Sequence, residues 1–181
     1  MKEEYPDRRY RKTLGFLKEH TDPGETILDI GTPNRFSSLM QKEGYKVYNT
    51  GGEDLDINYN VIRNYDVDCY TSFQIFEHLL APFNILNAIP RGKLISSVPL
   101  KVWFSQAYWS RDDEWDRHYH EFEPRQYDWL LQKSGWKIIS SELWRSPDKI
   151  RPGIRPLLRL IWPSYYFVCA VKDDHATERR K

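Results

Sequence analysis

Hydrophobic residues along this chain follow two different spacings, which predict helices separated by buried strands. In residues 5–20, Leu14, Leu17 and their apolar neighbours recur with charged residues between them, a spacing typical of an amphipathic helix. Later segments carry short unbroken apolar runs, and these predict strands that are buried on both faces. The predicted strands are TILDIG, YKVYNT, the beginning of VDCYTSFQIFEHL, GKLISSVPL, WKIISSELW and SYYFVCAVK, and the helices between them are RFSSLMQKEG, EHLLAPFNILNAI and EPRQYDWLLQKSG.

The order of these elements predicts the class of fold. Strands that alternate with helices favour an α/β architecture, with a mainly parallel sheet and helices on both faces. No proper helix separates the last two strands, so we expect an antiparallel C-terminal edge. Between the second and third strands, GGEDLDINYN predicts a turn that leads into a short extended piece. At 181 residues the chain suits one domain, which we place at residues 1–172.

Three segments do not fit this framework. Residues 101–122 are very aromatic and have no clean period, which is typical of a functional loop or lid. Residues 145–163 form a basic insertion punctuated by prolines. Its run from Arg145 to Arg159 is either a solvated face or a contact for an acidic acceptor, a peripheral membrane surface or RNA. Residues 173–181 are polar, and we expect a flexible tail.

Composition narrows the class of protein further. The formal net charge is only +1, so there is no global attraction to nucleic acid or to anionic membranes. The sequence contains no leading apolar segment of the signal-peptide type and no apolar run near 18 residues, so we expect no signal peptide and no transmembrane segment. Cys69 and Cys169 each lie in an apolar run, which predicts buried, inert thiols and a cytoplasmic location.

The segment from Glu25 to Val47 reads as strand, tight turn, helix and strand, the way a nucleotide-binding unit begins. Its turn, GTPNRF, has one glycine where such loops usually carry three. Pro33 cannot adopt a positive φ, and it has no backbone N–H to donate. We therefore expect Asn34 to be the residue that tolerates the left-handed region, in a loop that still turns but has a bulkier lining.

A longer motif points to a family. In VDCYTSFQIFEHLLAPFNIL, an aspartate is followed by apolar residues, a Thr-Ser-Phe segment, Glu-His-Leu and a proline. This pattern resembles the fourth strand and the following helix of the class I S-adenosylmethionine-dependent methyltransferases. LDIG is similar to their first cofactor motif, EDLDIN to their short second acidic motif, and HYHEFEPRQYDWLLQKSGWKI to their late segment. The resemblance covers about residues 26–172.

The resemblance implies a Rossmann-like class I methyltransferase fold that binds S-adenosylmethionine outside the carboxyl ends of its strands. This cofactor has no phosphate, so the loop need not cradle an anion. Transferred position by position, the resemblance implies a cofactor site made of Asp29, Gly31, Thr32, Asn34, Glu53, Asp54, Asp56, Thr71, Phe73 and Gln74.

The chain departs from the family pattern at two places. Pro33 and Arg35 occupy the positions of the second and third glycines, and Arg35 either pairs with the cofactor carboxylate or points into solvent. The second strand ends in Asn-Thr-Gly, where the family commonly has an acid for the ribose hydroxyls. Glu53 or Asp54 would substitute for that acid through a shifted turn, and Asn49 is a weaker candidate.

Three histidines are candidates for a general base, because imidazole titrates near neutral pH. We favour His118 or His120 over His78. On a strand, His118 and His120 would share a face, as metal ligands do, and acidic residues lie just before them. A polar lid accounts for the same residues, so we expect no metal. Glu77 and His78 would point about 100° apart on a helix and would not form an acid–base pair.

The function that the resemblance implies is methyl transfer to an oxygen or nitrogen of a small-molecule or glycan-type acceptor. The chain lacks the Asn/Asp-Pro-Pro-aromatic signature with which similar enzymes methylate base amino groups, so we do not expect DNA as a partner and disfavour RNA. The alternative is a degenerate methyltransferase-like domain that acts as a partner or regulatory module, for which GTPNRF and the missing acid are the evidence.

Overall fold

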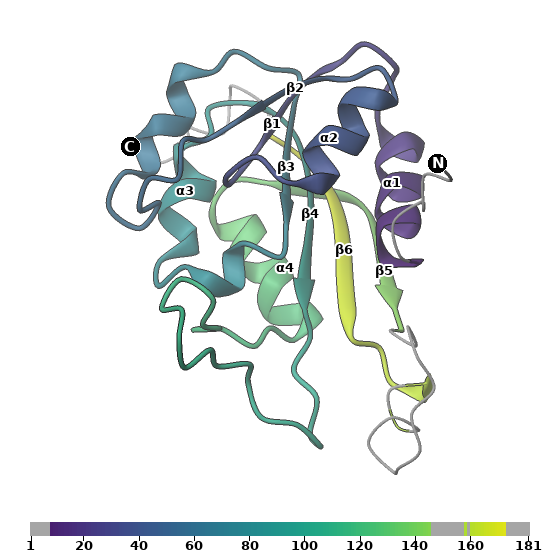
Figure 1. Ribbon diagram of the computed structural model, residues 1–181, viewed down its shortest axis with the longest axis vertical. Coiled ribbons are helices and arrows are strands. Elements are labelled where there is room, and N and C mark those ends of the chain that lie inside the picture. The colour runs from purple at the N-terminus through teal and green to yellow at the C-terminus, as the bar shows by residue number, and fades with distance from the viewer. Residues whose placement is uncertain (1–7, 146–157, 159, 173–181) are drawn as a thin grey trace.

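The computed structural model describes residues 8–145, 158 and 160–172 (Figure 1). The strands are β1 (Thr26–Asp29), β2 (Lys46–Asn49), β3 (Cys69–Phe73), β4 (Gly92–Pro99), β5 (Lys137–Trp144) and β6 (Tyr165–Lys172). The α-helices are α1 (Arg8–His20), α2 (Arg35–Lys42), α3 (Pro82–Ala88) and α4 (Pro124–Lys133), and two 3₁₀ helices are η1 (Tyr59–Asn64) and η2 (Phe76–His78).

Within the described ranges, the strands form one six-stranded sheet in the order β2-β1-β3-β4-β6-β5. Strands β1 to β4 are parallel, and β6 runs antiparallel to both β4 and β5. The prediction of a mainly parallel sheet with antiparallel pairing at its C-terminal end is confirmed. The last strand lies between β4 and β5, so that β5 occupies the edge.

Helices cover both faces of this sheet, as predicted (Figure 1). Successive strand residues point to opposite faces, so Ile27 packs with α1 and α2 while Leu28 packs with α3 and α4. On the first face, Phe167 of β6 meets Phe16 of α1 with ring centroids 5.7 Å apart. Continuous apolar strands therefore supply two core layers at once.

The predicted helix EHLLAPFNILNAI is divided in the structure. Residues Phe76–His78 form a single 3₁₀ turn, and α3 begins only at Pro82. Proline has no backbone N–H and suits the first position of a helix rather than its interior. The expected extended piece near residue 60 is also different, because η1 forms there.

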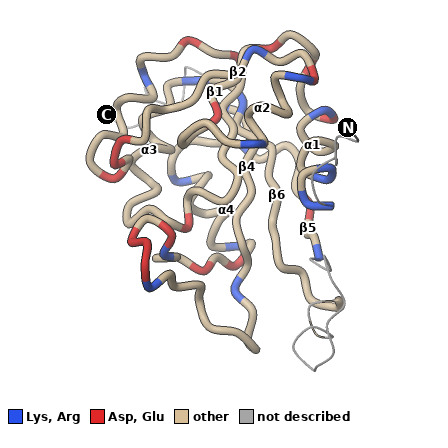
Figure 2. Tube along the Cα trace, viewed as in Figure 1, with Lys and Arg blue, Asp and Glu red and all other residues tan. Residues whose placement is uncertain are grey.

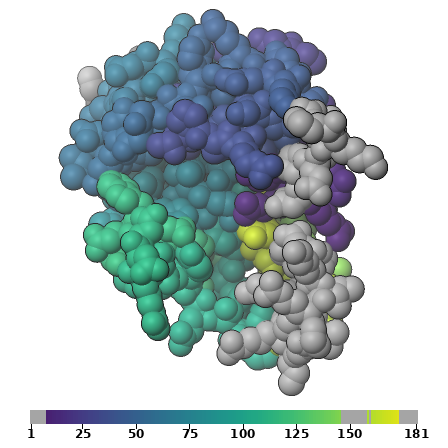
Figure 3. Space-filling view, viewed as in Figure 1, coloured from purple at the N-terminus to yellow at the C-terminus, as the bar shows by residue number. Residues whose placement is uncertain are grey.

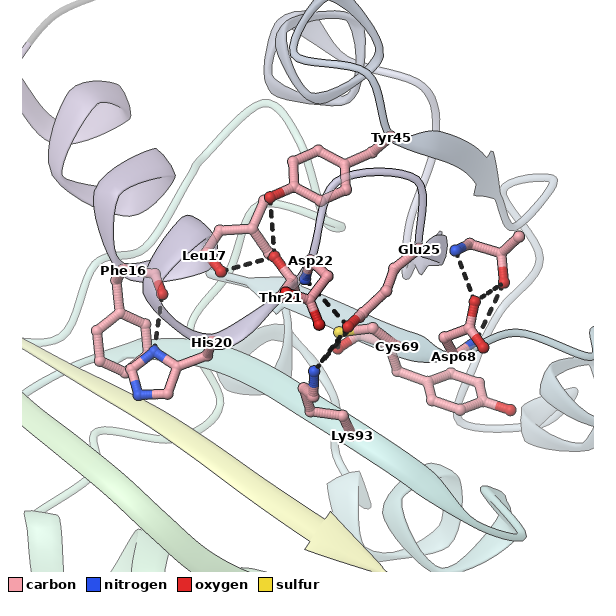
Figure 4. A network of polar contacts seen from close by, with 12 residues as sticks. Phe16, Leu17, His20, Thr21, Asp22, Glu25, Tyr45, Asp68, Cys69 and Lys93 are labelled. Carbon is pink, nitrogen blue, oxygen red and sulfur yellow. Dashed lines mark hydrogen bonds and ion pairs between the residues drawn. The ribbon is translucent and has the colours of Figure 1, made fainter.

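Polar contacts tie the strands together at the amino ends of β1, β3 and β4, far from the loops that follow those strands (Figure 4). The Lys93 ammonium lies 3.0 Å from a carboxylate oxygen of Glu25. The Asp68 carboxylate accepts from the Thr26 backbone N–H at 2.8 Å and from its hydroxyl at 2.7 Å. The first contact links the amino ends of β1 and β4, the second links those of β1 and β3, and the opposite edge of the sheet is left for a site.

Cys69 and Cys169 are both buried free thiols, as the sequence predicts. Burial raises the pKa of Cys69 well above its usual value and raises that of Cys169 to about 11. Thiols with raised pKa values are poor nucleophiles at neutral pH.

No helix among the described residues is long and apolar enough to cross a bilayer. The predicted basic insertion, apart from a few residues at its ends, and the predicted tail at 173–181 lie outside the described residues.

Candidate functional site

The carboxylate of Asp29 is the centre of a hydrogen-bond network at the end of β1. Its Oδ1 accepts from the Thr71 hydroxyl at 2.8 Å, and its Oδ2 accepts from the Ser37 hydroxyl at 2.7 Å. The amides of Asn49 and Asn34 donate to Oδ2 at 3.3 and 3.4 Å. Burial raises the pKa of Asp29, and these four donors oppose that rise. The network joins β1, β2, β3 and α2 at one point.

The first loop turns at Gly31, where φ is +116°, a backbone conformation that residues other than glycine rarely adopt. The Gly31 N–H donates to the Thr50 hydroxyl at 2.9 Å, and a Cβ placed on Gly31 would lie 3.3 Å from the Ile75 side chain. Thr32 and Arg35 are exposed, and the Thr32 carbonyl accepts from the Asn34 amide at 3.3 Å.

Asn34 does not occupy the left-handed region, so that expectation is wrong. Its φ of −142° and ψ of 179° are extended, and it is the N-cap of α2. Its side-chain oxygen accepts from the N–H groups of Phe36 at 2.8 Å and Ser37 at 3.1 Å. An asparagine that caps a helix has an extended backbone, because only that geometry aims its side chain at the free N–H groups.

The position of the expected ribose acid is held by Asn49. Its amide donates to the backbone carbonyls of Asp29 at 3.1 Å and Gly31 at 3.3 Å. The Glu53 carboxylate folds over Gly51, where an added Cβ would lie 2.9 Å from its Oε1. The Asp54 side chain accepts from the Asp56 N–H at 3.0 Å within a turn.

Asp56 lies at the start of α3 rather than beside the Asp29 network. Its carboxylate accepts from the N–H groups of Leu80 at 2.9 Å and Ala81 at 2.7 Å. An anionic side chain at this end of the helix satisfies two free N–H groups and complements the helix dipole. The bonds also fix the chain that follows η2.

A cavity of about 130 Å³ lies beneath the first loop. Asp29, Phe73 and Gln74 line it from the sheet, and Arg9 and Tyr10 line it from α1. The Phe73 ring meets Phe36 edge-on with centroids 5.1 Å apart, so one wall is aromatic. Binding pockets for whole ligands are usually about 300–1,000 Å³, so this cavity fits part of such a molecule.

A second cavity, of about 540 Å³, adjoins the first, and Arg9 and Gln74 line both. Gln74 has a φ of +61°, and its side-chain amide donates to the Ser97 hydroxyl at 3.1 Å. Glu77, His78 and His118 lie on the wall of the second cavity. A left-handed backbone conformation is uncommon for a residue other than glycine. At Gln74 it marks a constrained turn where the two cavities meet.

The structure brings His78 and His118 together and turns His120 away. The rings of His78 and His118 are 4.8 Å apart and perpendicular, whereas the His120 Nε2 lies 3.2 Å from the carbonyl of Leu80. The N–H groups of Tyr119 and His120 donate to the Glu77 carbonyl at 2.8 and 3.2 Å. This pairing places the loop after β4 against η2.

Glu77 and His78 approach each other, contrary to the helical expectation. Their nearest side-chain atoms, Oε1 and Nε2, are 3.9 Å apart within the 3₁₀ turn. Burial raises the pKa of Glu77 to about 8 and lowers that of His78. Burial and the neighbouring His78 also lower the pKa of His118. Burial therefore disfavours the charged form of all three groups.

Residues 101–122 form a loop that borders the second cavity. Its acidic residues gather on the segment between β4 and α4 in Figure 2, and Figure 3 shows the same segment, in green, standing beside a hollow below the region in blue. Trp103 is 71% exposed. Tyr108 donates to Asp116 at 2.8 Å and the Arg117 guanidinium lies 4.8 Å from the Trp109 ring centroid, so the loop has internal structure.

Arg9 and Glu77 are the site residues that sequence reasoning missed. Arg9 lies in a helix far from the motifs, and only its contact with both cavities identifies it. Glu77 is part of the quoted Glu-His-Leu motif, but nothing in the sequence shows that its carboxyl is completely buried.

Comparison with known proteins supports the fold. No protein-family model and no curated protein matches the chain in sequence. A putative S-adenosylmethionine-dependent methyltransferase from Listeria monocytogenes is similar in structure, with a TM-score of 0.60 and 12% identity over 91% of this chain and 98% of that chain. Phosphoethanolamine N-methyltransferase 2 of Haemonchus contortus, solved with S-adenosyl-L-methionine, gives a TM-score of 0.54 and 15% identity over 90% of this chain and 52% of that chain.

The [4+2]-cyclase SpnF has a TM-score of 0.57 and 14% identity over 93% of this chain and 84% of that chain. The three likenesses show that the chain has the Rossmann-like fold of the class I methyltransferases, as the sequence predicts. Because a cyclase has a similar fold, the reaction must be argued from the site.

Proposed function

We propose that this chain transfers a methyl group from S-adenosylmethionine to an oxygen or nitrogen of a small-molecule or glycan-type acceptor. The observation that carries the proposal is the pair of adjoining cavities at the carboxyl ends of the parallel strands. One is lined by Asp29 and Asn34, the other is lined by His78 and His118, and Arg9 and Gln74 line both. Ligands of open α/β sheets bind at this edge.

The residues of the first cavity suit the methionine end of the cofactor. Asp29 and Gln74 offer oxygen acceptors for an ammonium group, and Arg9 offers a guanidinium for a carboxylate. Tyr10, Phe36 and Phe73 supply an apolar wall for the remainder. Asp29, Gly31, Thr32, Asn34, Glu53, Asp54, Asp56, Thr71, Phe73 and Gln74 remain the proposed cofactor residues.

When bound, S-adenosylmethionine would supply a methyl group that passes to an acceptor lone pair as the carbon–sulfur bond breaks and its electron pair stays on sulfur. The shared wall of Arg9 and Gln74 holds the two cavities in contact, which is the main requirement when the leaving group is already activated. His118 and His78 have lowered pKa values and so are uncharged bases that can take the acceptor proton. His120 remains a third candidate.

Calorimetric titration of the full chain with S-adenosylmethionine and S-adenosylhomocysteine tests this function. We expect one site per chain for each ligand. At a hundred times the dissociation constant, binding adds about 2.7 kcal/mol of stability, a Tm rise of about 5–10 °C for a domain of this size. Asp29→Asn should weaken both titrations, while Asp22→Asn, which changes an exposed aspartate, should not.

Absence of heat and of any Tm change up to millimolar ligand would overturn the proposal. The fold would stand, and the degenerate partner or regulatory module would replace the enzyme. If binding is found, incubation with small hydroxyl- and amine-bearing acceptors and detection of S-adenosylhomocysteine would identify the acceptor class.

A further inference from the structure

Three side chains with metal-binding atoms converge on the wall of the second cavity. One carboxylate oxygen of Glu77 and one ring nitrogen each of His78 and His118 all lie within 4.8 Å of one another. Glu77 and His78 come from η2, and His118 comes from the loop that the Glu77 carbonyl holds against it. We propose that Glu77, His78 and His118 bind one divalent transition-metal ion.

The donor set indicates the kind of ion. Two imidazoles and one carboxylate are a common protein ligand set for zinc in catalytic sites, and similar sets bind iron(II). Bonds of about 2.0–2.2 Å place tetrahedral donor atoms about 3.4 Å apart. The separation of Glu77 Oε1 and His78 Nε2 is 3.9 Å, so small side-chain rotations complete the geometry. Magnesium prefers oxygen ligands and fits this set poorly.

The burial of Glu77 independently points to a ligand. Its side chain is 0% exposed, and neither carboxylate oxygen has a hydrogen-bond partner among the described residues. A buried carboxyl group without a partner is unfavourable, whereas a bound cation satisfies it. The positive charge of Arg9 acts on Glu77 across the cavity, but Arg9 does not hydrogen-bond to either carboxylate oxygen.

The orientation of His78 also suits metal binding. Its Nδ1 lies 3.2 Å from the backbone carbonyl of Arg117. A carbonyl only accepts hydrogen bonds, so Nδ1 carries the proton and the lone pair of Nε2 faces Glu77. Metal-binding histidines usually donate their other ring N–H in this way, which fixes the ring.

The charges around the second cavity favour a cation. Among its described lining residues, Glu77, Asp116 and Glu121 are acidic, and Arg9 is the one basic residue other than the histidines. Three protein ligands leave at least one coordination position for a ligand in the cavity. With the ion bound, the lone pairs of His78 and His118 hold the metal and do not take the acceptor proton, so His120 remains the candidate base. That an acceptor hydroxyl takes the open position rests on the proposed function, whereas binding of the ion itself does not.

The test uses the full chain after treatment with a chelator, without S-adenosylmethionine. Co²⁺ is titrated while its visible absorption is recorded, and Zn²⁺ is titrated by calorimetry. We expect one ion per chain, with Mg²⁺ unable to displace Co²⁺. Glu77→Gln, His78→Asn and His118→Asn should each weaken Co²⁺ binding by more than the ~10–100-fold that loss of a supporting residue causes.

His120→Asn is the matched control, because His120 lies on the same loop but turns to the Leu80 carbonyl. It should bind Co²⁺ as the wild type does. Circular dichroism of the metal-free variants establishes that each one folds, and Glu77→Gln removes no hydrogen bond that the described structure shows.

Failure of Co²⁺ and Zn²⁺ to bind, or equal losses in His118→Asn and His120→Asn, would overturn the metal site. Unchanged binding in Glu77→Gln would overturn it too. Titration with S-adenosylmethionine in the presence of the chelator is a separate measurement. The two proposals can therefore fail independently.

Discussion

Asn49 and Asp29 meet across neighbouring strands, where the Asn49 amide donates to the Asp29 backbone carbonyl at 3.1 Å and to its carboxylate at 3.3 Å. An acid was expected at the end of β2, but an acid there would face the buried Asp29 carboxyl. The amide instead supplies donors that hold the first loop against β2.

Replacement of Asn49 by alanine should therefore lower stability. The substitution removes the donor to Asp29 and Gly31, and we expect a loss of about 1–3 kcal/mol in the free energy of unfolding. Urea denaturation followed by circular dichroism measures it. Asn60→Ala, at an exposed position, is the control, and equal losses in the two variants would show that the bonds at β1 contribute nothing.

Arg9 should contribute to cofactor binding. Arg9→Gln removes the guanidinium from the first cavity, and we expect S-adenosylmethionine and S-adenosylhomocysteine to bind about tenfold more weakly, because both carry the same carboxylate. Calorimetry compares it with Arg11→Gln, which changes an exposed arginine on the same helix. If affinity for both ligands is unchanged, Arg9 serves the second cavity instead.

The hydrogen bonds from Thr26 lower the pKa of Asp68, which gives stability a defined pH dependence. The folded state binds this proton less readily than the unfolded state, so the contribution is complete above the unfolded pKa and is lost as pH falls through the folded pKa. Asp68→Ala should be less stable than wild type at pH 7 by up to about 1 kcal/mol, since the carboxylate is exposed.

Chemical denaturation at several pH values measures this difference, which should shrink in acid. The neighbouring exposed Asp66→Ala variant is the control for the loss of an aspartate from this surface. A difference between Asp68→Ala and wild type that persists unchanged in acid would attribute the effect to packing rather than to the charge.

Tyr127 offers a test of the core beneath the second cavity. Its buried hydroxyl donates to the Ser96 hydroxyl at 2.8 Å, and burial raises its pKa. Tyr127→Phe should cost about 1–2 kcal/mol, because it removes a buried hydrogen bond and leaves Ser96 with one partner fewer. Tyr166→Phe, which removes a less buried bond to Asp128, should cost less in thermal unfolding. The reverse order would contradict this account.

The sequence predicted the sheet because unbroken apolar runs such as YYFVCAV require burial on both faces, whatever the loops do. It also placed Asp29 near other strand ends, since parallel strands bring their carboxyl ends to one edge. It failed for Glu77 and His78, because adjacent residues on a 3₁₀ turn point about 120° apart, so the 3.9 Å approach of their side-chain tips depends on side-chain torsions that leave no pattern in the sequence.

The choice between His118 and His120 was also beyond sequence reasoning. Residues two apart on a strand point to the same face, so the sequence gives no reason to prefer His118 over His120. The path of the loop, held where the N–H groups of Tyr119 and His120 donate to the Glu77 carbonyl, decides which ring meets His78. Such backbone contacts depend on elements distant in sequence and leave no local pattern.

The wall that Arg9 and Gln74 form between the two cavities has a thermodynamic consequence. A ligand that restrains these side chains in one cavity changes the conformational entropy that remains to be lost when the other cavity fills. Linkage then requires reciprocity, so each ligand alters the affinity of the other by the same factor. The affinity for either ligand therefore has to be measured both with and without the other ligand bound.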